Sequence, residues 1–147
     1  MNWPLLVVIQ IAALSLEVTE KRWALYEARR LANSMSKPML NIGSRSWMEA
    51  ALMADVNLDI EYQPGIPNFV LGDAQDLSHW PDKHFGSIFA SHVLEHVEDP
   101  ARALGEWQRV AEYQVIAVPY WGSPHAWLSP QHRHVFIGSY VVRTWWP

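Results

Sequence analysis

The sequence predicts a doubly wound α/β domain with a mostly parallel sheet of about five strands, preceded by an N-terminal helix or helices. From residue 37 onward, short apolar segments typical of buried strands alternate with helical segments or long links. Half of the 147 residues are hydrophobic, which is enough to build one sizeable core. Several apolar segments end on small or acidic residues, as strands do at the ligand-binding edge of open parallel sheets.

The first 36 residues are expected to form an apolar and then amphipathic helical segment, ahead of an α/β domain over residues 37–147. Residues 5–16 are almost wholly apolar, but this run is shorter than the roughly 20 residues that span a bilayer. No Lys or Arg precedes it, which disfavours a secretory signal. Two interpretations stay open: helices packed on the domain or on another subunit, and a membrane-associated segment with the body on the cytoplasmic side.

The first half of the predicted domain contains two strands joined by a short helix. The strand over Met39–Gly43 is followed by Ser46 and Glu49, which match the pattern of a capping box. The helix that they open can run only to about Ala54. Residues 55–60 then alternate between polar and apolar side chains, as a strand should.

The second half supplies three more strands and a well-marked helix. The strands are predicted over residues 69–71, 88–90 and 115–118. Asp99 as N-cap and Pro100 at the first helical position open a helix between the last two strands. Because strands separated by helices or long links pair in parallel, the crossovers should be right-handed.

Charge and cysteine content exclude several classes of function. Residues 51–100 carry nine acidic residues and one lysine, within a chain of net charge −4. An acidic surface repels a phosphate backbone, so nucleic acid is not expected as a partner, whereas a cationic small molecule would be tolerated. The chain has no cysteine, which rules out disulfides, thiolate metal sites and cysteine nucleophiles.

Four strand ends carry the candidate site. Gly43, Asp59, Asp73 and the pair Ser91-His92 all fall at predicted carboxyl ends. A glycine at the first turn lets the backbone approach a ligand closely. A carboxylate at the end of the second strand can accept hydrogen bonds from ribose hydroxyls. This row of residues therefore suits a nucleoside-type ligand.

In order and spacing, residues 38–120 resemble the class I S-adenosylmethionine-dependent methyltransferases, particularly the small type 11 group. The resemblance implies a Rossmann-like sheet of strand order 3-2-1-4-5. It also implies that the following residues bind the cofactor S-adenosylmethionine: Asn41, Gly43 and Ser44 beside the methionine part, Asp59 on the ribose, Asp73 and Ala74 at the adenine, and Ser91 between cofactor and acceptor.

The resemblance implies transfer of a methyl group to a small-molecule or sugar-like acceptor in the cytoplasm. His92 directly follows the strand end that would face the methyl group, so it could remove the acceptor's proton, or it could be structural. The aromatic segment over residues 119–128 could cover the acceptor pocket. The apolar N-terminal segment could contact a membrane or mediate self-association.

Some features depart from the family pattern. Ser44-Arg45-Ser46 stands where a second glycine is usual, so Arg45 must fold away from the cofactor or reach its carboxylate. Gly86 stands where relatives commonly have an acidic residue, and the C-terminal part is abbreviated. Arg45, the abbreviated C-terminal part and the apolar N-terminus motivate a second hypothesis, a non-catalytic methyltransferase-like domain that serves in binding or interaction.

A third hypothesis is a zinc hydrolase, because residues 92–96 read H-x-x-E-H. That chemistry requires both histidines on one face of a sustained helix. Pro100 leaves room for barely one turn, so we expect local hydrogen bonding by Glu95 and His96 and no metal ligand among the site residues. His132 and His134 could bind a metal or substrate, but an exposed polar turn is the commoner explanation for such residues.

Overall fold

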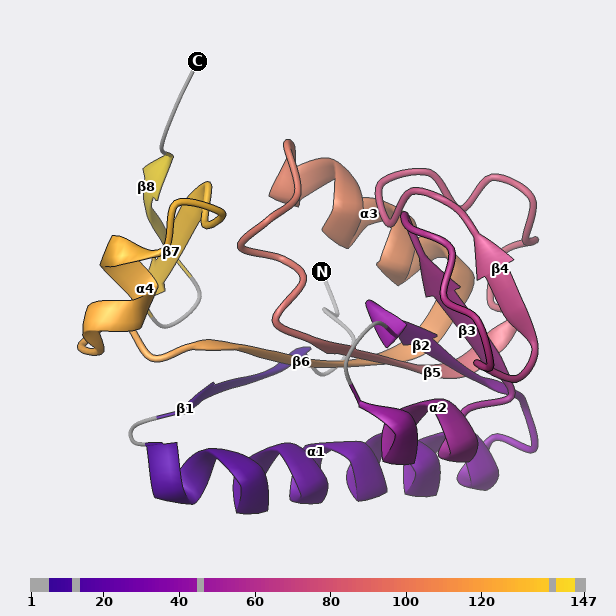
Figure 1. Ribbon diagram of the computed structural model, residues 1–147. Coiled ribbons are helices and arrows are strands. Elements are labelled where there is room, and N and C mark those ends of the chain that lie inside the picture. Colours follow the sequence, from indigo (N-terminus) through magenta and orange to yellow (C-terminus); the bar gives the residue numbers. More distant parts are fainter. Residues whose placement is uncertain (1–5, 12–13, 45–46, 138–139, 145–147) are drawn as a thin grey trace.

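The protein is described by a computed structural model that covers residues 6–11, 14–44, 47–137 and 140–144 (Figure 1). Six strands form one sheet in which every pairing is parallel, in the order β1-β6-β5-β2-β3-β4. The strands are β1 (Leu6–Ile11), β2 (Met39–Ile42), β3 (Val56–Asp59), β4 (Phe69–Leu71), β5 (Phe85–Ser91) and β6 (Ala111–Pro119). The five strands from β2 to β6 confirm the predicted order 3-2-1-4-5.

Helices cover both faces of this sheet, as the doubly wound prediction requires (Figure 1). On one face, α1 (Leu14–Ser34) and α2 (Met48–Met53) enclose a core that includes Leu25, Met39 and Phe89. On the other face, α3 (Pro100–Val110) buries Trp107 against a second core. Burial of these apolar side chains on both faces is the main contribution to the stability of the sheet.

Residues 6–11 of the apolar N-terminal run form a strand, which corrects the helix expected there, whereas residues 14–16 belong to α1. β1 pairs in parallel with β6 over six residues and becomes the edge of the sheet. A short apolar run fits a buried strand as well as a helix, and here pairing with a distant strand decides between them. The helix predicted downstream is confirmed by α1. α1 ends at Ser34 and β2 begins at Met39.

α1 approaches β5 so closely that only glycine fits at position 86. A Cβ atom placed on Gly86 would lie 2.8 Å from the Ala32 Cα atom and 3.1 Å from the Lys37 Cβ atom. The Ser87 hydroxyl donates a 2.6 Å hydrogen bond to the Ala28 carbonyl of the same helix. The departure at Gly86 is therefore a packing requirement of α1.

The two predicted helix starts differ in outcome. Asp99 caps α3 as expected, because its Oδ1 atom accepts hydrogen bonds of 3.0 Å from the backbone N–H groups of Ala101 and Arg102. The capping box predicted before α2 involves Ser46, which lies outside the described residues. α2 begins after Trp47, which makes no side-chain cap, and Glu49 accepts a 2.9 Å hydrogen bond from Arg22.

After β6 the chain forms a small substructure beside the sheet. It consists of α4 (Pro124–Leu128) and an antiparallel pair, β7 (His134–Ile137) and β8 (Tyr140–Thr144). Within the described ranges, no helix combines the length and the apolar character that crossing a membrane requires.

Candidate functional site

The carboxyl ends of β2, β3 and β4 meet at one edge of the sheet, joined by backbone hydrogen bonds. The Gly43 N–H donates to the Leu58 carbonyl at 2.9 Å, and the Gly72 N–H donates to the Asp59 carbonyl at 3.0 Å. These bonds hold the turns after the three strands side by side. The strand register therefore brings Gly43, Asp59 and Asp73 to one place, as predicted.

A cavity of about 1170 Å³, here called the large cavity, opens at this edge. Five of the seven predicted cofactor residues line it, together with the predicted base: Gly43, Asp59, Asp73, Ala74, Ser91 and His92. The same wall carries the carboxylates of Glu61 and Glu98 and the guanidinium of Arg133. The large cavity is thus mainly acidic, which suits a ligand with positive charge.

Gly43 occupies a position that no other residue could fill without strain. Its φ is +78°, in the left-handed region, and an added Cβ would lie only 2.3 Å from the Val93 Cγ2 atom. Both limits favour glycine, since it lacks a Cβ atom. The turn after β2 and the turn after β5 consequently stay in contact beside the large cavity.

Asp59 and Asp73 face the large cavity in different environments. Asp59 is buried, and its Oδ1 atom accepts a 3.1 Å hydrogen bond from the Glu61 N–H. Asp73 is exposed and accepts a 2.8 Å hydrogen bond from the Gln75 N–H. Each carboxylate is oriented by the turn that follows it and still lines the cavity.

Ala74 is held at the cavity wall by α3. The buried Trp107 indole donates a 2.8 Å hydrogen bond from Nε1 to the Ala74 carbonyl. Gln75 extends this connection, because its Oε1 atom accepts a 2.7 Å hydrogen bond from the Asp99 N–H at the start of α3. The segment expected at the adenine is therefore tied to α3.

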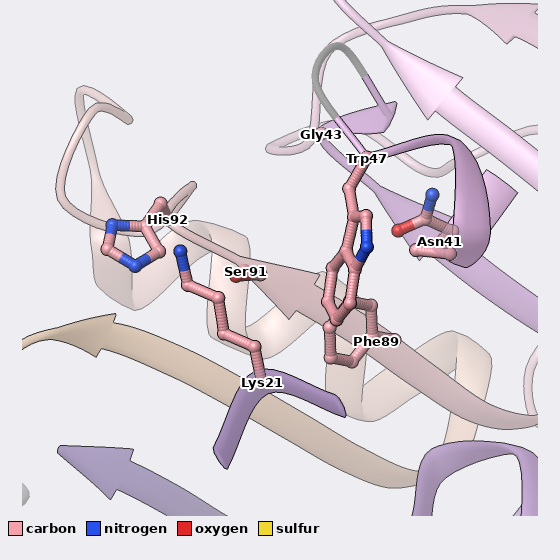
Figure 2. A pocket seen from close by; sticks show the side chains of 8 residues that line it. Lys21, Asn41, Gly43, Trp47, Phe89, Ser91 and His92 are labelled. Atoms are coloured by element: carbon pink, nitrogen blue, oxygen red, sulfur yellow. The ribbon is translucent and has the colours of Figure 1, made fainter. Parts of the chain in front are cut away.

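A second cavity of about 310 Å³, here called the small cavity, lies between α1 and the ends of β2 and β5 (Figure 2). Its lining residues are Lys21, Asn41, Gly43, Trp47, Ala50, Phe89, Ser91 and His92. Figure 2 shows the Lys21 amine directed toward Ser91 and His92. The Trp47 and Phe89 rings meet edge to face with centroids 5.9 Å apart. Gly43, Ser91 and His92 line both cavities and mark where they join.

Lys21 and Trp47 were not predicted as site residues. Lys21 lies on α1, more than 20 residues before the first strand-end loop, and no local motif marks it. Its position on the face of α1 that packs toward β5 could have indicated its place, but that packing is not visible in the sequence. Arg45, which was expected either to fold away from the cofactor or to reach its carboxylate, lies outside the described residues.

Asn41 and Ser44 have more internal positions than the other predicted cofactor residues. Asn41 is buried and donates a 2.9 Å hydrogen bond from Nδ2 to Asn57 Oδ1, on the neighbouring strand. It lines the small cavity only. Ser44 is buried and lines neither cavity, and its Oγ atom has no hydrogen-bond partner among the described residues.

His92 adopts a backbone conformation unusual for a residue with a side chain. Its φ is +56°, and its N–H donates a 2.8 Å hydrogen bond to the Ala117 carbonyl of β6. Its Nδ1 atom lies 3.3 Å from Glu95 Oε1. Left-handed backbone at a non-glycine residue is held by its surroundings and is frequent at functional sites.

Glu95 lies at the centre of a cluster of histidines. Its side chain is 1% exposed, and neither carboxylate oxygen makes a hydrogen bond within the described residues. The backbone carbonyl of Glu95 accepts from the N–H groups of Arg133 and His134 at 2.7 and 3.2 Å, which docks the segment after α4 here. His132 is brought beside His96 in this way, and burial lowers the pKa of His132. Residues 92–98 form turns instead of a helix, as expected.

The segment after β6 contributes to the site through residues other than those predicted. Neither cavity is lined by residues 119–128, which were expected to cover an acceptor pocket. Pro130, Gln131 and Arg133 line the large cavity instead. These residues reach the large cavity through the backbone hydrogen bonds of their segment to Glu95, which no local sequence pattern predicts.

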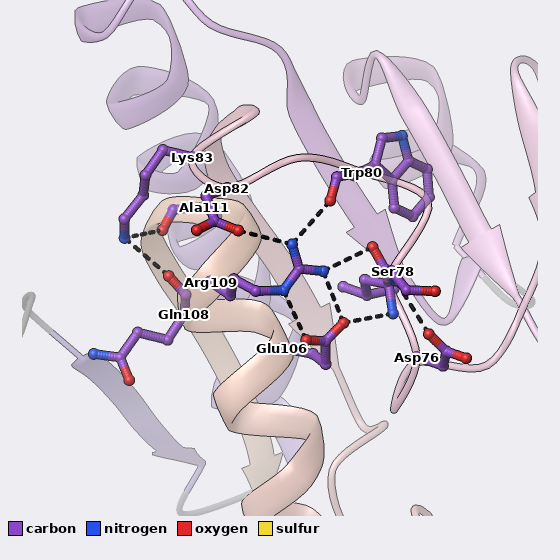
Figure 3. Close-up of polar contacts among 10 residues, drawn as sticks. Asp76, Ser78, Trp80, Asp82, Lys83, Glu106, Gln108, Arg109 and Ala111 are labelled. Carbon is purple, nitrogen blue, oxygen red and sulfur yellow. Dashed lines mark hydrogen bonds and ion pairs between the residues drawn. The ribbon is translucent and has the colours of Figure 1, made fainter.

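A different polar cluster holds the long link between β4 and β5 against α3 (Figure 3). Arg109 donates to Glu106 through Nε at 2.8 Å and to the carbonyls of Trp80 and Leu77 at 2.9 and 3.0 Å. Glu106 also accepts from the Leu77 N–H at 2.9 Å. Hydrogen bonding to Arg109 is the main reason that the pKa of Glu106 is lowered. We call Arg109, Glu106 and their backbone partners the Arg109 cluster.

Comparison with known proteins gives a family for this architecture. Residues 28–115 match the family model described as a methyltransferase domain. No curated protein matches the chain. Among solved structures, the chain is similar to a SAM-dependent methyltransferase of Thermotoga maritima, described as a possible histamine N-methyltransferase. The sequence identity is 20%, the TM-score is 0.43, and the match covers 66% of this chain and 54% of that one. The chain thus spans about half the length of that protein.

Proposed function

Because the chain belongs to the methyltransferase domain family, we propose that it transfers a methyl group from S-adenosylmethionine to a small-molecule or sugar-like acceptor. The observation that carries the proposal is the large cavity, where Gly43, Asp59, Asp73, Ala74 and Ser91 converge. These residues are the ones that a nucleoside ligand needs at the edge of an open sheet.

The described residues fit this cofactor in shape and charge. The left-handed turn at Gly43 leaves a backbone surface without a side chain, and Asp59 presents a buried carboxylate for two ribose hydroxyls. Asp73 and Ala74 form the wall assigned to the adenine. Lys21 in the small cavity offers a cation for the cofactor's carboxylate, a role that was one of the two alternatives for Arg45.

When bound, S-adenosylmethionine supplies a methyl group on a positively charged sulfur. The protein's part in such a displacement is to align the acceptor, exclude water and take up a proton. Ser91 and His92 lie where the two cavities join, so we assign the acceptor to this junction. His92 is the proposed general base, and Glu95 beside its Nδ1 atom is a positioning residue.

The acidic wall of the large cavity supports a small acceptor over nucleic acid. Four carboxylates line it, from Asp59, Glu61, Asp73 and Glu98. A nucleic-acid backbone would meet repulsion there. The cytoplasmic location, and contact with a membrane or self-association through the N-terminal residues, stay predictions from the sequence.

Calorimetry with S-adenosylmethionine and with its demethylated product tests the proposal. We expect micromolar dissociation constants for the wild-type chain. Asp59→Ala should weaken binding about tenfold or more, since hydrogen bonds to a charged group contribute about 1.5–3 kcal/mol each. Glu27→Ala, which removes an acid on α1 paired with Arg30 outside both cavities, is the matched control.

Three results distinguish the hypotheses. Absence of heat with either ligand would refute the proposal. Binding that is insensitive to Asp59→Ala would refute the assigned site. Binding without methyl transfer to any acceptor in a small-molecule panel would favour the non-catalytic, methyltransferase-like binding domain.

A further inference from the structure

The cluster around Glu95 has the composition of a metal site. One ligand atom from each of Glu95, His96 and His132 lies within 4.8 Å of the other two. Glu95 and His96 follow β5, whereas His132 arrives from the segment after α4, so three side chains from two distant segments converge on one point. The set is a carboxylate and two imidazoles, which is a ligand set that zinc accepts.

The two imidazoles are oriented as metal ligands usually are. His96 Nδ1 lies 2.8 Å from the Gln131 carbonyl, and His132 Nδ1 lies 3.4 Å from the Ala126 carbonyl. Because a carbonyl only accepts, each Nδ1 atom carries the proton and each Nε2 atom keeps its lone pair. A backbone carbonyl on the second nitrogen is the outer-shell arrangement that fixes the tautomer of metal-binding histidines.

The carboxylate supplies an independent observation. Glu95 is 1% exposed, yet neither oxygen makes a hydrogen bond among the described residues. The nearest cationic candidates are His92 Nδ1 at 3.3 Å and His96 Nε2 at 3.9 Å from Oε1. A buried carboxylate without hydrogen bonds is costly unless a positive charge is close to it. A divalent cation between the carboxylate and the two Nε2 atoms would meet that need.

We propose that Glu95, His96 and His132 bind one divalent transition-metal ion of the zinc type. Zinc ligands at about 2.0–2.1 Å in a tetrahedron lie roughly 3.4 Å apart, so the side chains would rotate inward on binding. Since His96 lines the large cavity, the ion would lie at the cavity wall beside the proposed acceptor position. The site is distinct from the H-x-x-E-H pattern, because His132 takes the place of His92 as a ligand.

Competition with a chromophoric zinc chelator tests this on the full chain, without any need for activity. We expect one zinc ion per wild-type chain, and for cobalt the visible absorption typical of a tetrahedral site. His96→Ala and His132→Ala should each weaken zinc binding by more than about 100-fold, since even outer-shell changes cost 10–100-fold. Magnesium should not compete, because it prefers oxygen ligands.

Controls separate this site from weak binding by surface histidines. His84→Ala removes an exposed histidine outside the cluster and should bind zinc like the wild type. His125→Ala removes the other ring beside His132, with centroids 4.9 Å apart, and should have the same outcome. His96 is partly exposed, so its variant should fold even if His132→Ala does not. Equal zinc affinity of the wild type and His96→Ala would overturn the proposal.

Discussion

Two polar clusters of this domain are built from similar residues and differ in how their charges are satisfied. In the Arg109 cluster, the guanidinium and the Glu106 carboxylate bond to each other and to backbone groups of the 72–84 link. In the cluster after β5, the Glu95 carboxylate is more deeply buried and has no hydrogen bond among the described residues.

The difference separates a structural role from a functional one. A long link without regular structure needs partners for its backbone groups, and Arg109 supplies them with a rigid, planar donor set. The Glu95 carboxylate, in contrast, makes no hydrogen bond to a backbone group among the described residues. A buried carboxylate without hydrogen bonds is usually retained for binding or chemistry, so substitution of Glu95 should affect function more than stability.

The largest expected effect is on turnover, through His92→Gln. If His92 removes the acceptor's proton, this variant should lose methyl transfer by about 100-fold or more, in the range of general base catalysis. Its affinity for S-adenosylmethionine and its unfolding midpoint should stay near the wild-type values. His84→Gln serves as the control, and equal turnover of both variants would assign His92 a structural role.

The next effect is on stability, through Glu106→Ala. The substitution removes the partner of two Arg109 nitrogens and of the Leu77 N–H. We expect the free energy of unfolding in urea to fall by about 2 kcal/mol, given charge-assisted hydrogen bonds that are partly screened by solvent. Cofactor affinity should change little, because Glu106 lines neither cavity.

The dependence of stability on acid pH tests the role of Glu106 in a second way. The pKa of Glu106 in the folded state lies below its usual 4.5, chiefly through its hydrogen bonds with Arg109. The stabilisation is therefore complete above the unfolded-state value and is lost as the pH falls through the lowered pKa. Glu106→Gln should flatten the acid limb of the stability curve, and an unchanged limb would contradict this role.

The smallest expected effect is on stability, through Glu95→Gln. Measured with a metal chelator present, the variant should be as stable as the wild type or up to about 1 kcal/mol more stable, because a neutral amide costs less to bury. Glu106→Gln is the matched replacement in the other cluster. If Glu95→Gln lowered the free energy of unfolding as much as Glu106→Gln does, the distinction between the two clusters would be wrong.

Local patterns were sufficient for the parts of the fold that depend on neighbouring residues. The cap at Asp99 and Pro100 predicts α3 because both signals act within one turn. Apolar segments ending at Gly43, Asp59 and Asp73 predict the ligand edge because parallel strands place their carboxyl ends together.

Long-range contacts decided what could not be predicted. The apolar run of β1 becomes a strand through pairing with β6, more than 100 residues away. Lys21 reaches the small cavity because α1 packs along β5, and His132 reaches Glu95 through backbone bonds between two loops. None of these contacts can be inferred from the hydrophobic periodicity of the segments that make them.

The pairing of β1 with β6 also constrains the order in which the protein folds. During synthesis β1 and α1 leave the ribosome before β5 and β6, the strands that they dock on, which begin at residues 85 and 111. Contacts of such large sequence separation slow folding and leave apolar segments uncovered meanwhile. β1 therefore has no strand to pair with until β6 has been synthesised.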